Sequence, residues 1–122
     1  MTTIDLTAET FESTLKDSNI MLVDWWAEWC GPCKMFGPTY EKASDAHPDI
    51  VFAKVDTEAN QQLAGSAGIQ SIPTLMVFKE NILIFSQAGA LQPAQLEELI
   101  QATKNVNMDD VRKEIAKQQE NK

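Results

Sequence analysis

The run Ile20–Trp26 constrains the fold of this chain more than any other segment, because it is apolar throughout except at Asp24. A strand that is apolar on both faces must be covered on both faces, which is typical of a parallel sheet with helices on each side. A second apolar run, Ile50–Val55, follows after Pro32–His47, which has the pattern of a helix. The order strand, helix, strand predicts an α/β fold.

The rest of the chain continues this alternation. The other expected elements are a short strand at Ile4–Leu6, a helix from Thr7 to about Asp17, a helix at Glu58–Ser66, a hairpin of Thr74–Phe78 and Ile82–Phe85, and a helix that begins at Pro93. We expect a mixed sheet, parallel where helices cross over and antiparallel at the hairpin.

The segment after Lys104 departs from the pattern. Asn107 is a good helix N-cap, and one side of the following helix carries Met108, Val111 and Ile115. We therefore divide the chain into a main domain, residues 1–105, and a short helical extension, residues 106–122.

Composition excludes several kinds of partner. The chain has 122 residues, the size of one domain, and a net charge of -8 with Arg112 as its one arginine. Nucleic acids and anionic membrane surfaces are poor partners for such a protein. No apolar run approaches the ~20 residues of a spanning helix, and the acidic first ten residues do not resemble a signal peptide. We expect a cytoplasmic monomer.

Two cysteines, Cys30 and Cys33, carry the strongest chemical signal. A reducing cytoplasm disfavours a permanent structural disulfide, and one pair with the single His47 cannot complete a zinc site of four protein ligands. Residues three apart on a helix have Cα atoms roughly 5 Å apart, within the range for a disulfide. A Cys-x-x-Cys motif between a buried strand and a helix indicates redox chemistry rather than a chance pair.

The order of the motif suggests a role for each thiol. Cys30 comes just before the helix, and Cys33 lies in its first turn, where free N–H groups and the helix dipole stabilise a thiolate. We expect Cys30, the more exposed by position and with Lys34 nearby, to be the nucleophile and Cys33 the resolving thiol. Gly31 keeps the turn uncrowded, and Pro32 suits the start of a helix.

The motif Trp29–Lys34 reads Trp-Cys-Gly-Pro-Cys-Lys and resembles the active site of thioredoxins. The resemblance extends from about Ile4 to Thr103. Further matching positions are Asp24, Trp26–Glu28, Pro38, Lys54, Asp56, Ile72–Thr74 and Gly89–Ala90.

This resemblance implies the thioredoxin fold, a central mixed five-stranded sheet flanked by four helices, here over residues 1–105. It implies reduction of protein disulfides, with roles in electron transport and cell redox homeostasis. No cofactor would be bound, because the disulfide itself is the redox centre. NADPH would be used indirectly, through the partner enzyme thioredoxin reductase.

Asp24 has two interpretations. Burial should raise the pKa of this carboxyl, so that it could accept the proton of Cys33 as that thiol attacks the mixed disulfide, as the resemblance also implies. Alternatively, Asp24 is a structural acid paired with Lys54 on the neighbouring strand. Both interpretations can hold together.

The segment Ile72-Pro73-Thr74 resembles the family's cis-proline loop, which faces the cysteines; without the resemblance, Pro73 would be an ordinary proline at a strand start. The backbone of Ile72 would then offer hydrogen bonds to an extended substrate peptide. Substrate binding is expected at Ile72, cis-Pro73, Thr74, Gly89 and Ala90. With Trp29, Gly31 and Pro32, most of these would form a flat, uncharged patch around Cys30. Ordinary core packing is the alternative for Trp29, and His47 is expected on the surface.

Three functions compete. The first is a thioredoxin-type protein-disulfide reductase, because Gly31-Pro32 stands where a strongly oxidising relative would usually carry a histidine. The second is a binding module in which the apolar patch acts as a clamp, although a clamp would need neither cysteine. The third is a dimer in which two cysteine pairs hold zinc or an iron–sulfur cluster; Pro32 and Pro73 argue against it by resemblance.

Overall fold

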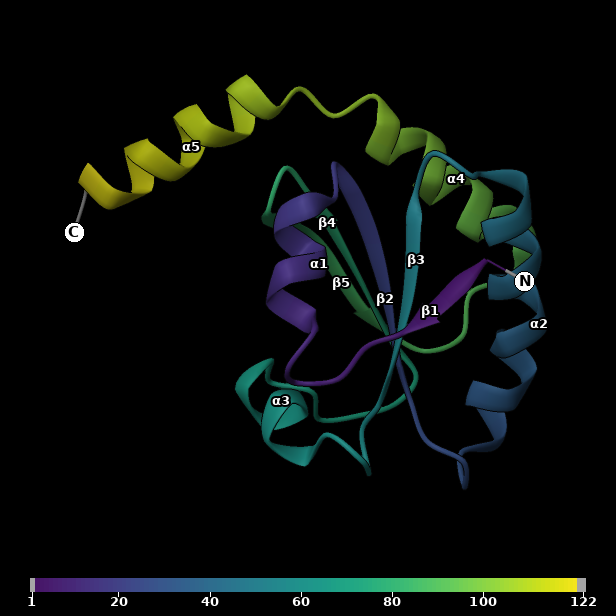
Figure 1. The fold of residues 1–122 in the computed structure, drawn as a ribbon. Coiled ribbons are helices and arrows are strands. Elements are labelled where there is room, and N and C mark those ends of the chain that lie inside the picture. The colour runs from purple at the N-terminus through teal and green to yellow at the C-terminus, as the bar shows by residue number, and fades with distance from the viewer. Residues whose placement is uncertain (1, 121–122) are drawn as a thin grey trace.

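The computed structural model describes residues 2–120 and shows a sheet covered on both faces by helices (Figure 1). The strands are β1 (Thr3–Asp5), β2 (Ile20–Trp26), β3 (Val51–Asp56), β4 (Thr74–Lys79) and β5 (Ile82–Ala88). The helices are α1 (Phe11–Asp17), α2 (Gly31–Ala46), α3 (Gln61–Ser66), α4 (Pro93–Lys104) and α5 (Met108–Glu120). The sheet has five strands in the order β1-β3-β2-β4-β5, and the predicted mixed α/β fold is confirmed. Residues 1, 121 and 122, which the two predicted segments include, lie outside the described residues.

Side-chain alternation along β2 builds two hydrophobic cores. Ile20 and Leu22 belong to the core that α2 and α4 close with Phe36, Tyr40, Leu96 and Ile100. Met21, Val23 and Trp25 belong to the opposite core, which α1 and α3 close with Phe11 and Ala64. Successive side chains of a strand point to opposite faces, so Asp24 points to the side of α2 and α4.

The direction of β4 differs from our expectation. β2 and β3 are parallel, but β4 runs antiparallel to β2 although α3 lies between β3 and β4. α3 has six residues and lies at the end of the sheet where β3 stops (Figure 1). The chain therefore enters β4 from that same end, and β4 runs opposite to β2.

Two helices begin later than predicted. α1 begins at Phe11 rather than Thr7, because the Thr10 hydroxyl accepts a hydrogen bond from the Thr7 N–H at 3.0 Å and fixes a turn. α3 begins at Gln61 rather than Glu58, because a carboxylate oxygen of Asp56 accepts the N–H of Glu58 at 2.9 Å. In both places a hydrogen bond between a side chain and the backbone fixes a separate turn where the sequence predicted the first turn of the helix.

The predicted hairpin is confirmed. Glu80 and Asn81 join β4 to β5 with φ of 51° and 69°. Left-handed conformations at both central residues match the twist of the flanking strands, and asparagine accepts them readily.

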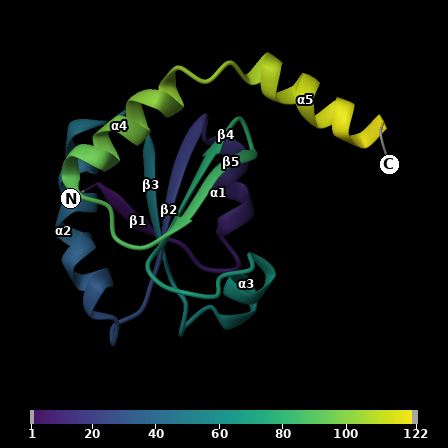
Figure 2. The same cartoon turned by 180° about the vertical axis from the view of Figure 1, so that it is seen from behind.

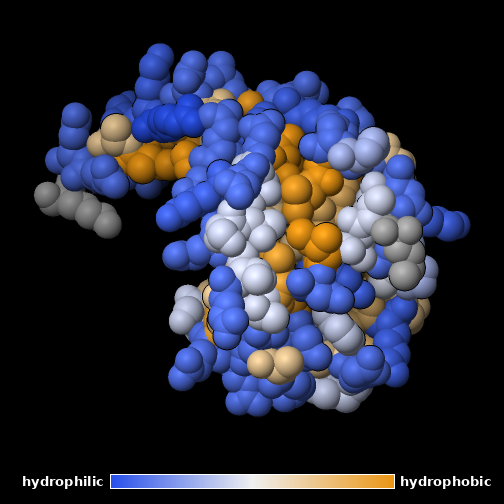
Figure 3. Space-filling model, in the orientation of Figure 1, coloured by the Kyte–Doolittle hydropathy of each residue, from blue (hydrophilic) through white to orange (hydrophobic). Residues whose placement is uncertain are grey.

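The extension forms the predicted helix, α5, and projects away from the domain (Figure 2). Asn107 caps it, since its side-chain oxygen accepts the N–H groups of Asp109 and Asp110 at 2.9 and 3.2 Å. Met108 is buried, whereas Ile115 is 37% exposed. Figure 3 shows a hydrophobic strip along the underside of the projecting helix. No helix within residues 2–120 has the length and apolar character needed to cross a membrane.

A buried lysine fixes the junction between α4 and α5. The Lys79 ammonium donates to the carbonyl oxygens of Thr103, Lys104 and Val106 at 2.8, 3.1 and 2.9 Å. These carbonyls lie at the C-terminal end of α4, where a positive charge is favourable.

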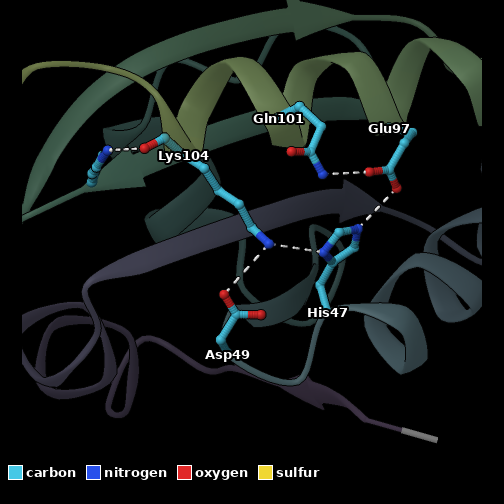
Figure 4. A network of polar contacts seen from close by, with 6 residues as sticks. His47, Asp49, Glu97, Gln101 and Lys104 are labelled. Carbon is cyan, nitrogen blue, oxygen red and sulfur yellow. Dashed lines mark hydrogen bonds and ion pairs between the residues drawn. The ribbon is translucent and has the colours of Figure 1, made fainter.

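The expectation for His47 is wrong, because the residue is only 8% exposed. The ring lies between α2 and α4, where Nε2 is 2.8 Å from Glu97 Oε1 and Nδ1 is 3.2 Å from Lys104 Nζ (Figure 4). Lys104 also pairs with Asp49 at 3.5 Å. Hydrogen bonds to Glu97 lower the pKa of its carboxyl, the one from His47 more than the one from Gln101. These partners come from a distant segment, so local sequence did not indicate them.

Candidate active site

The loop after β2 delivers the two cysteines to the start of α2. Cys30 is the N-cap residue, and Cys33 lies in the first turn. The two form a disulfide with a Cα–Cα separation of 5.2 Å, which confirms the distance expected from the spacing. The Cys33 N–H donates to the Cys30 sulfur at 3.2 Å. The first turn thus directs an N–H group at the sulfur, as stabilisation of a Cys30 thiolate would require.

Exposure does not separate the two thiols. In the disulfide form, Cys30 is 3% exposed and Cys33 is 4% exposed, so the expectation that Cys30 is the more exposed is wrong. The Cys30 sulfur lies 3.7 Å from the Ile72 carbonyl oxygen, so the loop that carries Ile72 helps to cover it. A distinction between the thiols would therefore have to come from the helix N-cap rather than from access.

The positive charge of Lys34 is partly offset by a neighbouring carboxylate. Its ammonium lies 3.9 Å from a carboxylate oxygen of Glu28, and both side chains are largely exposed. The pair reduces the net charge beside Cys30, and an exposed pair of this kind is weak.

A second loop lies against the disulfide. The Ile72–Pro73 peptide bond is cis, as predicted. The Gly89 N–H donates to the Pro73 carbonyl at 2.8 Å, which joins the loop after β5 to the cis-proline loop. The Thr74 hydroxyl donates to the Ser71 carbonyl at 2.6 Å and closes the turn. The residues expected to bind substrate thus come from two adjoining loops.

The surface of the expected patch is uneven. Gly31, Pro32, Gly89 and Ala90 are exposed, Ile72 is half-buried and Pro73 is buried.

Trp29 is 69% exposed, so ordinary core packing does not describe it. Its indole Nε1 donates to Glu58 Oε1 at 2.7 Å. Glu58 was not among the predicted site residues, although a signal was present. Parallel neighbouring strands end at the same edge of a sheet, so residues that follow β2 and β3 meet there.

The indole also borders a hollow beside the disulfide. This pocket has a volume of about 390 Å³ and is lined by Trp29, Thr57, Ala64, Ile69, Gln70, Ser71 and Ile72. It adjoins the cis-proline loop through Ile72 and offers room for a side chain of a bound peptide.

Asp24 is buried in β2, and neither carboxylate oxygen has a hydrogen-bond partner among residues 2–120. Burial raises the pKa of this carboxyl to about 7, and the Lys54 charge opposes the rise. The expected pairing with Lys54 is present in register, since the two residues are direct partners of β2 and β3, but not as a hydrogen bond. The Lys54 ammonium lies over the Trp26 ring, 4.9 Å from its centroid.

Comparison with known proteins identifies the fold and the motif together. The family model for thioredoxin matches residues 2–102. The chain belongs to the thioredoxin family. With the Cys30–Cys33 disulfide at the start of α2, this membership makes the protein a thioredoxin-type thiol-disulfide oxidoreductase.

Two relatives with thioredoxin names differ in how much of the chain they match. "Putative thioredoxin 2" of Streptomyces coelicolor is 54% identical over 117 residues, 96% of this chain and 87% of the relative. "Thioredoxin C-3" of Corynebacterium nephridii is 38% identical over 96 residues, 78% of this chain and 66% of the relative. The first alignment includes most of the 106–122 extension, so the extension is not peculiar to this chain.

Solved thioredoxin structures match the domain. Plasmodium falciparum thioredoxin has a TM-score of 0.76 and 33% identity, covering 82% of this chain and 97% of its own. Mitochondrial thioredoxin 3 of Saccharomyces cerevisiae, in the oxidised form, has a TM-score of 0.75 and 33% identity, covering 82% of this chain and 94% of its own.

Proposed function

We propose that the protein reduces disulfides of other proteins, with Cys30 as the attacking thiolate and Cys33 as the resolving thiol. The observation that carries this assignment is the position of Cys30 at the N-cap of α2, where the Cys33 N–H points at its sulfur. Such an environment favours the thiolate, which is the nucleophilic form of cysteine.

The reaction proceeds in two exchanges. The Cys30 thiolate attacks one sulfur of the substrate disulfide, forms a mixed disulfide and releases the other substrate sulfur as a thiolate. Cys33 then loses its proton to Asp24 and attacks the Cys30 sulfur. The second substrate thiolate leaves, and Cys30 and Cys33 are joined in a disulfide. The substrate disulfide has then gained the two electrons that the Cys30–Cys33 dithiol has lost.

Asp24 is suited to accept that proton. A base works best when its pKa lies near the operating pH, and burial raises the pKa of Asp24 to about 7. Its side chain points to the face of the sheet that α2 covers, and α2 carries Cys33 in its first turn. Lys54 has the opposing role, because its charge favours the ionised carboxylate.

The substrate peptide would lie along the cis-proline loop. The Ile72 carbonyl is 3.7 Å from the Cys30 sulfur, so a peptide paired with this backbone would bring its own sulfur to Cys30. Pro73 and Thr74 shape that loop, Gly89 is hydrogen-bonded to it with Ala90 next in the chain, and Trp29 lines the adjoining pocket together with Ile72.

A reducing partner must restore the dithiol after each cycle. We propose thioredoxin reductase, with NADPH as the distant electron source, and a cytoplasmic monomer that serves electron transport and redox homeostasis. The experiment is NADPH consumption by the purified protein with a thioredoxin reductase and a disulfide-containing protein. Sustained turnover supports the proposal, and turnover that persists in Cys30→Ser contradicts it.

The iron–sulfur form of the metal-bridged alternative has a simple test. Two cysteine pairs that hold an iron–sulfur cluster give visible absorbance, whereas an oxidised dithiol gives none. The Cys30–Cys33 disulfide favours the dithiol function, because a disulfide cannot provide thiolate ligands.

A further inference from the structure

Lys54 has two sites for its ammonium and occupies only one. Asp24 and Lys54 are direct partners in the parallel β2–β3 pair, yet neither Asp24 oxygen has a hydrogen-bond partner among the described residues. The Lys54 ammonium lies instead over the indole of Trp26, 4.9 Å from the ring centroid. This distance is within the range of a cation–π contact.

The arrangement follows from the strand geometry. Asp24 and Trp26 are two residues apart in β2, so their side chains point to the same face of the sheet. Lys54, on the adjacent strand, lies directly beside Asp24 and diagonally to Trp26. A flexible lysine side chain at this position can reach toward the carboxylate or toward the ring, and here its ammonium lies over the ring without a hydrogen bond to the carboxylate.

We propose that Trp26 is a positioning residue that holds the Lys54 ammonium over its indole ring and thereby prevents Lys54 from forming an ion pair with Asp24. This inference rests on the proposed role of Asp24 as proton acceptor for Cys33. Trp26 acts only through Lys54 and touches no reacting atom.

The chemical consequence concerns the basicity of Asp24. A carboxylate in direct contact with an ammonium has a lowered pKa and is a poorer base. Burial raises the pKa of Asp24 to about 7, and Lys54 at its present distance lowers it only in part. The ring of Trp26 thus helps to keep a proton acceptor that works near neutral pH.

Other groups around Asp24 do not provide this control. Tyr40 lies on α2, but its hydroxyl donates a hydrogen bond to the Ala53 carbonyl at 2.8 Å rather than to Asp24. The pKa of Tyr40 is raised, mainly by burial and to a smaller extent by the Asp24 charge. On β4, the residue opposite Asp24 is the apolar Leu75. On β3, Asp56 lies opposite Trp26, and its carboxylate accepts the N–H groups of the following turn.

The direct test is the pKa of Asp24, measured by NMR titration of its carboxyl carbon. In Trp26→Leu we expect the pKa to fall by about one unit, a tenfold change in proton affinity, because the released Lys54 pairs with Asp24. Trp26→Phe keeps an aromatic face and is the matched control, with a smaller fall. An unchanged pKa in Trp26→Leu overturns the proposal.

A second pathway to the same shift must be separated. Loss of the indole could admit water to Asp24, which would also lower its pKa. We therefore combine Trp26→Leu with Lys54→Met in a double-mutant cycle. If Trp26 acts through Lys54, the tryptophan substitution has no effect once Lys54 is replaced. An equal fall in both backgrounds shows that Trp26 excludes water, and this overturns the proposal.

A more conservative replacement of Trp26 provides the test if the Trp26→Leu variant does not fold. A tryptophan that is fluorinated on its benzene ring, placed at position 26 alone, keeps its shape but attracts cations more weakly. We expect the pKa of Asp24 to fall stepwise with the number of fluorine atoms, and not to change when Lys54→Met is present. A constant pKa across the series overturns the proposal.

The rate of disulfide reduction against pH separates this inference from the proposed function. If both hold, the rate profile of Trp26→Leu shifts to lower pH together with the pKa of Asp24. If the pKa shifts and the rate profile does not, Trp26 positions Lys54 as proposed, and the role of Asp24 as proton acceptor is wrong.

Discussion

The indole of Trp29 donates a hydrogen bond to Glu58 at 2.7 Å, although both side chains are exposed. An exposed tryptophan beside a reactive disulfide would otherwise rotate freely. This bond gives the ring one orientation, in which it forms a wall of the pocket next to Ile72. The relationship joins the loop after β2 to the loop after β3.

We predict that Glu58→Leu raises the KM for a protein disulfide substrate by about three- to tenfold, the net value of one ordinary hydrogen bond. The kcat should change little, because Glu58 lies outside the thiol chemistry. Glu58→Gln keeps an acceptor oxygen and is the matched control, with a KM near that of the unchanged protein. Equal KM values for both variants would mean that the orientation of Trp29 does not contribute to binding.

The two cysteines should respond differently to serine substitution. Cys33→Ser should accumulate a mixed disulfide between Cys30 and an oxidised substrate, because the resolving thiol is absent. Cys30→Ser should form no adduct and reduce no substrate. Mass spectrometry of each variant mixed with oxidised substrate measures this. An adduct on Cys33 alone would reverse the two roles.

Asp24→Asn should stabilise the fold in a pH-dependent way. Burial raises the pKa of Asp24 from 3.8 to about 7, so the folded state binds a proton that the unfolded state has released between these values. The free energy of unfolding therefore decreases as pH rises through this window, by about 1.4 kcal/mol for each pKa unit. The asparagine variant does not incur this loss and should be more stable by a few kcal/mol above about pH 7.

Denaturant unfolding at several pH values tests this prediction, with Asp17→Asn on the exposed surface of α1 as the control. The gain from Asp24→Asn should vanish below about pH 4, where Asp24 is protonated in both states. The same variant should slow reduction near neutral pH. A stability gain that does not vary with pH would exclude titration of Asp24 as its cause.

Removal of residues 106–122 should leave the fold and the thiol chemistry intact. The deletion should nevertheless lower the stability of the fold, because Met108 is buried and the Val106 carbonyl accepts a hydrogen bond from Lys79. We expect the free energy of unfolding to fall by about 2–3 kcal/mol, the value of one buried large side chain. A shorter deletion, 113–122, keeps both contacts and should cost much less. Loss of folding in the longer deletion would place the extension within the core.

The local features were predictable because neighbouring residues determine them. The apolar run Ile20–Trp26 specified a central strand, and the spacing of Cys30 and Cys33 specified a disulfide at a helix start. The acid within that run also indicated a raised pKa, because apolar surroundings disfavour the charged form of a carboxyl group.

The features that were missed depend on partners far along the chain. His47 is buried because α4 brings Glu97 and Lys104 to it, and no pattern near His47 indicates this. β4 runs antiparallel to β2 because the segment that contains α3 stays at the end of the sheet where β3 stops (Figure 1), and no pattern within that segment indicates this. Such distant contacts are fixed only by the assembled fold.

The position of α5 has a practical consequence. In both ribbon views, α5 lies at the opposite end of the molecule from the start of α2, where Cys30 is located (Figures 1 and 2). Lys79 holds the root of this helix through three carbonyl groups, so its point of departure is fixed. The protein could therefore be tethered through α5 to a bead or to a second polypeptide, while a large folded substrate still reaches the thiols from the free end.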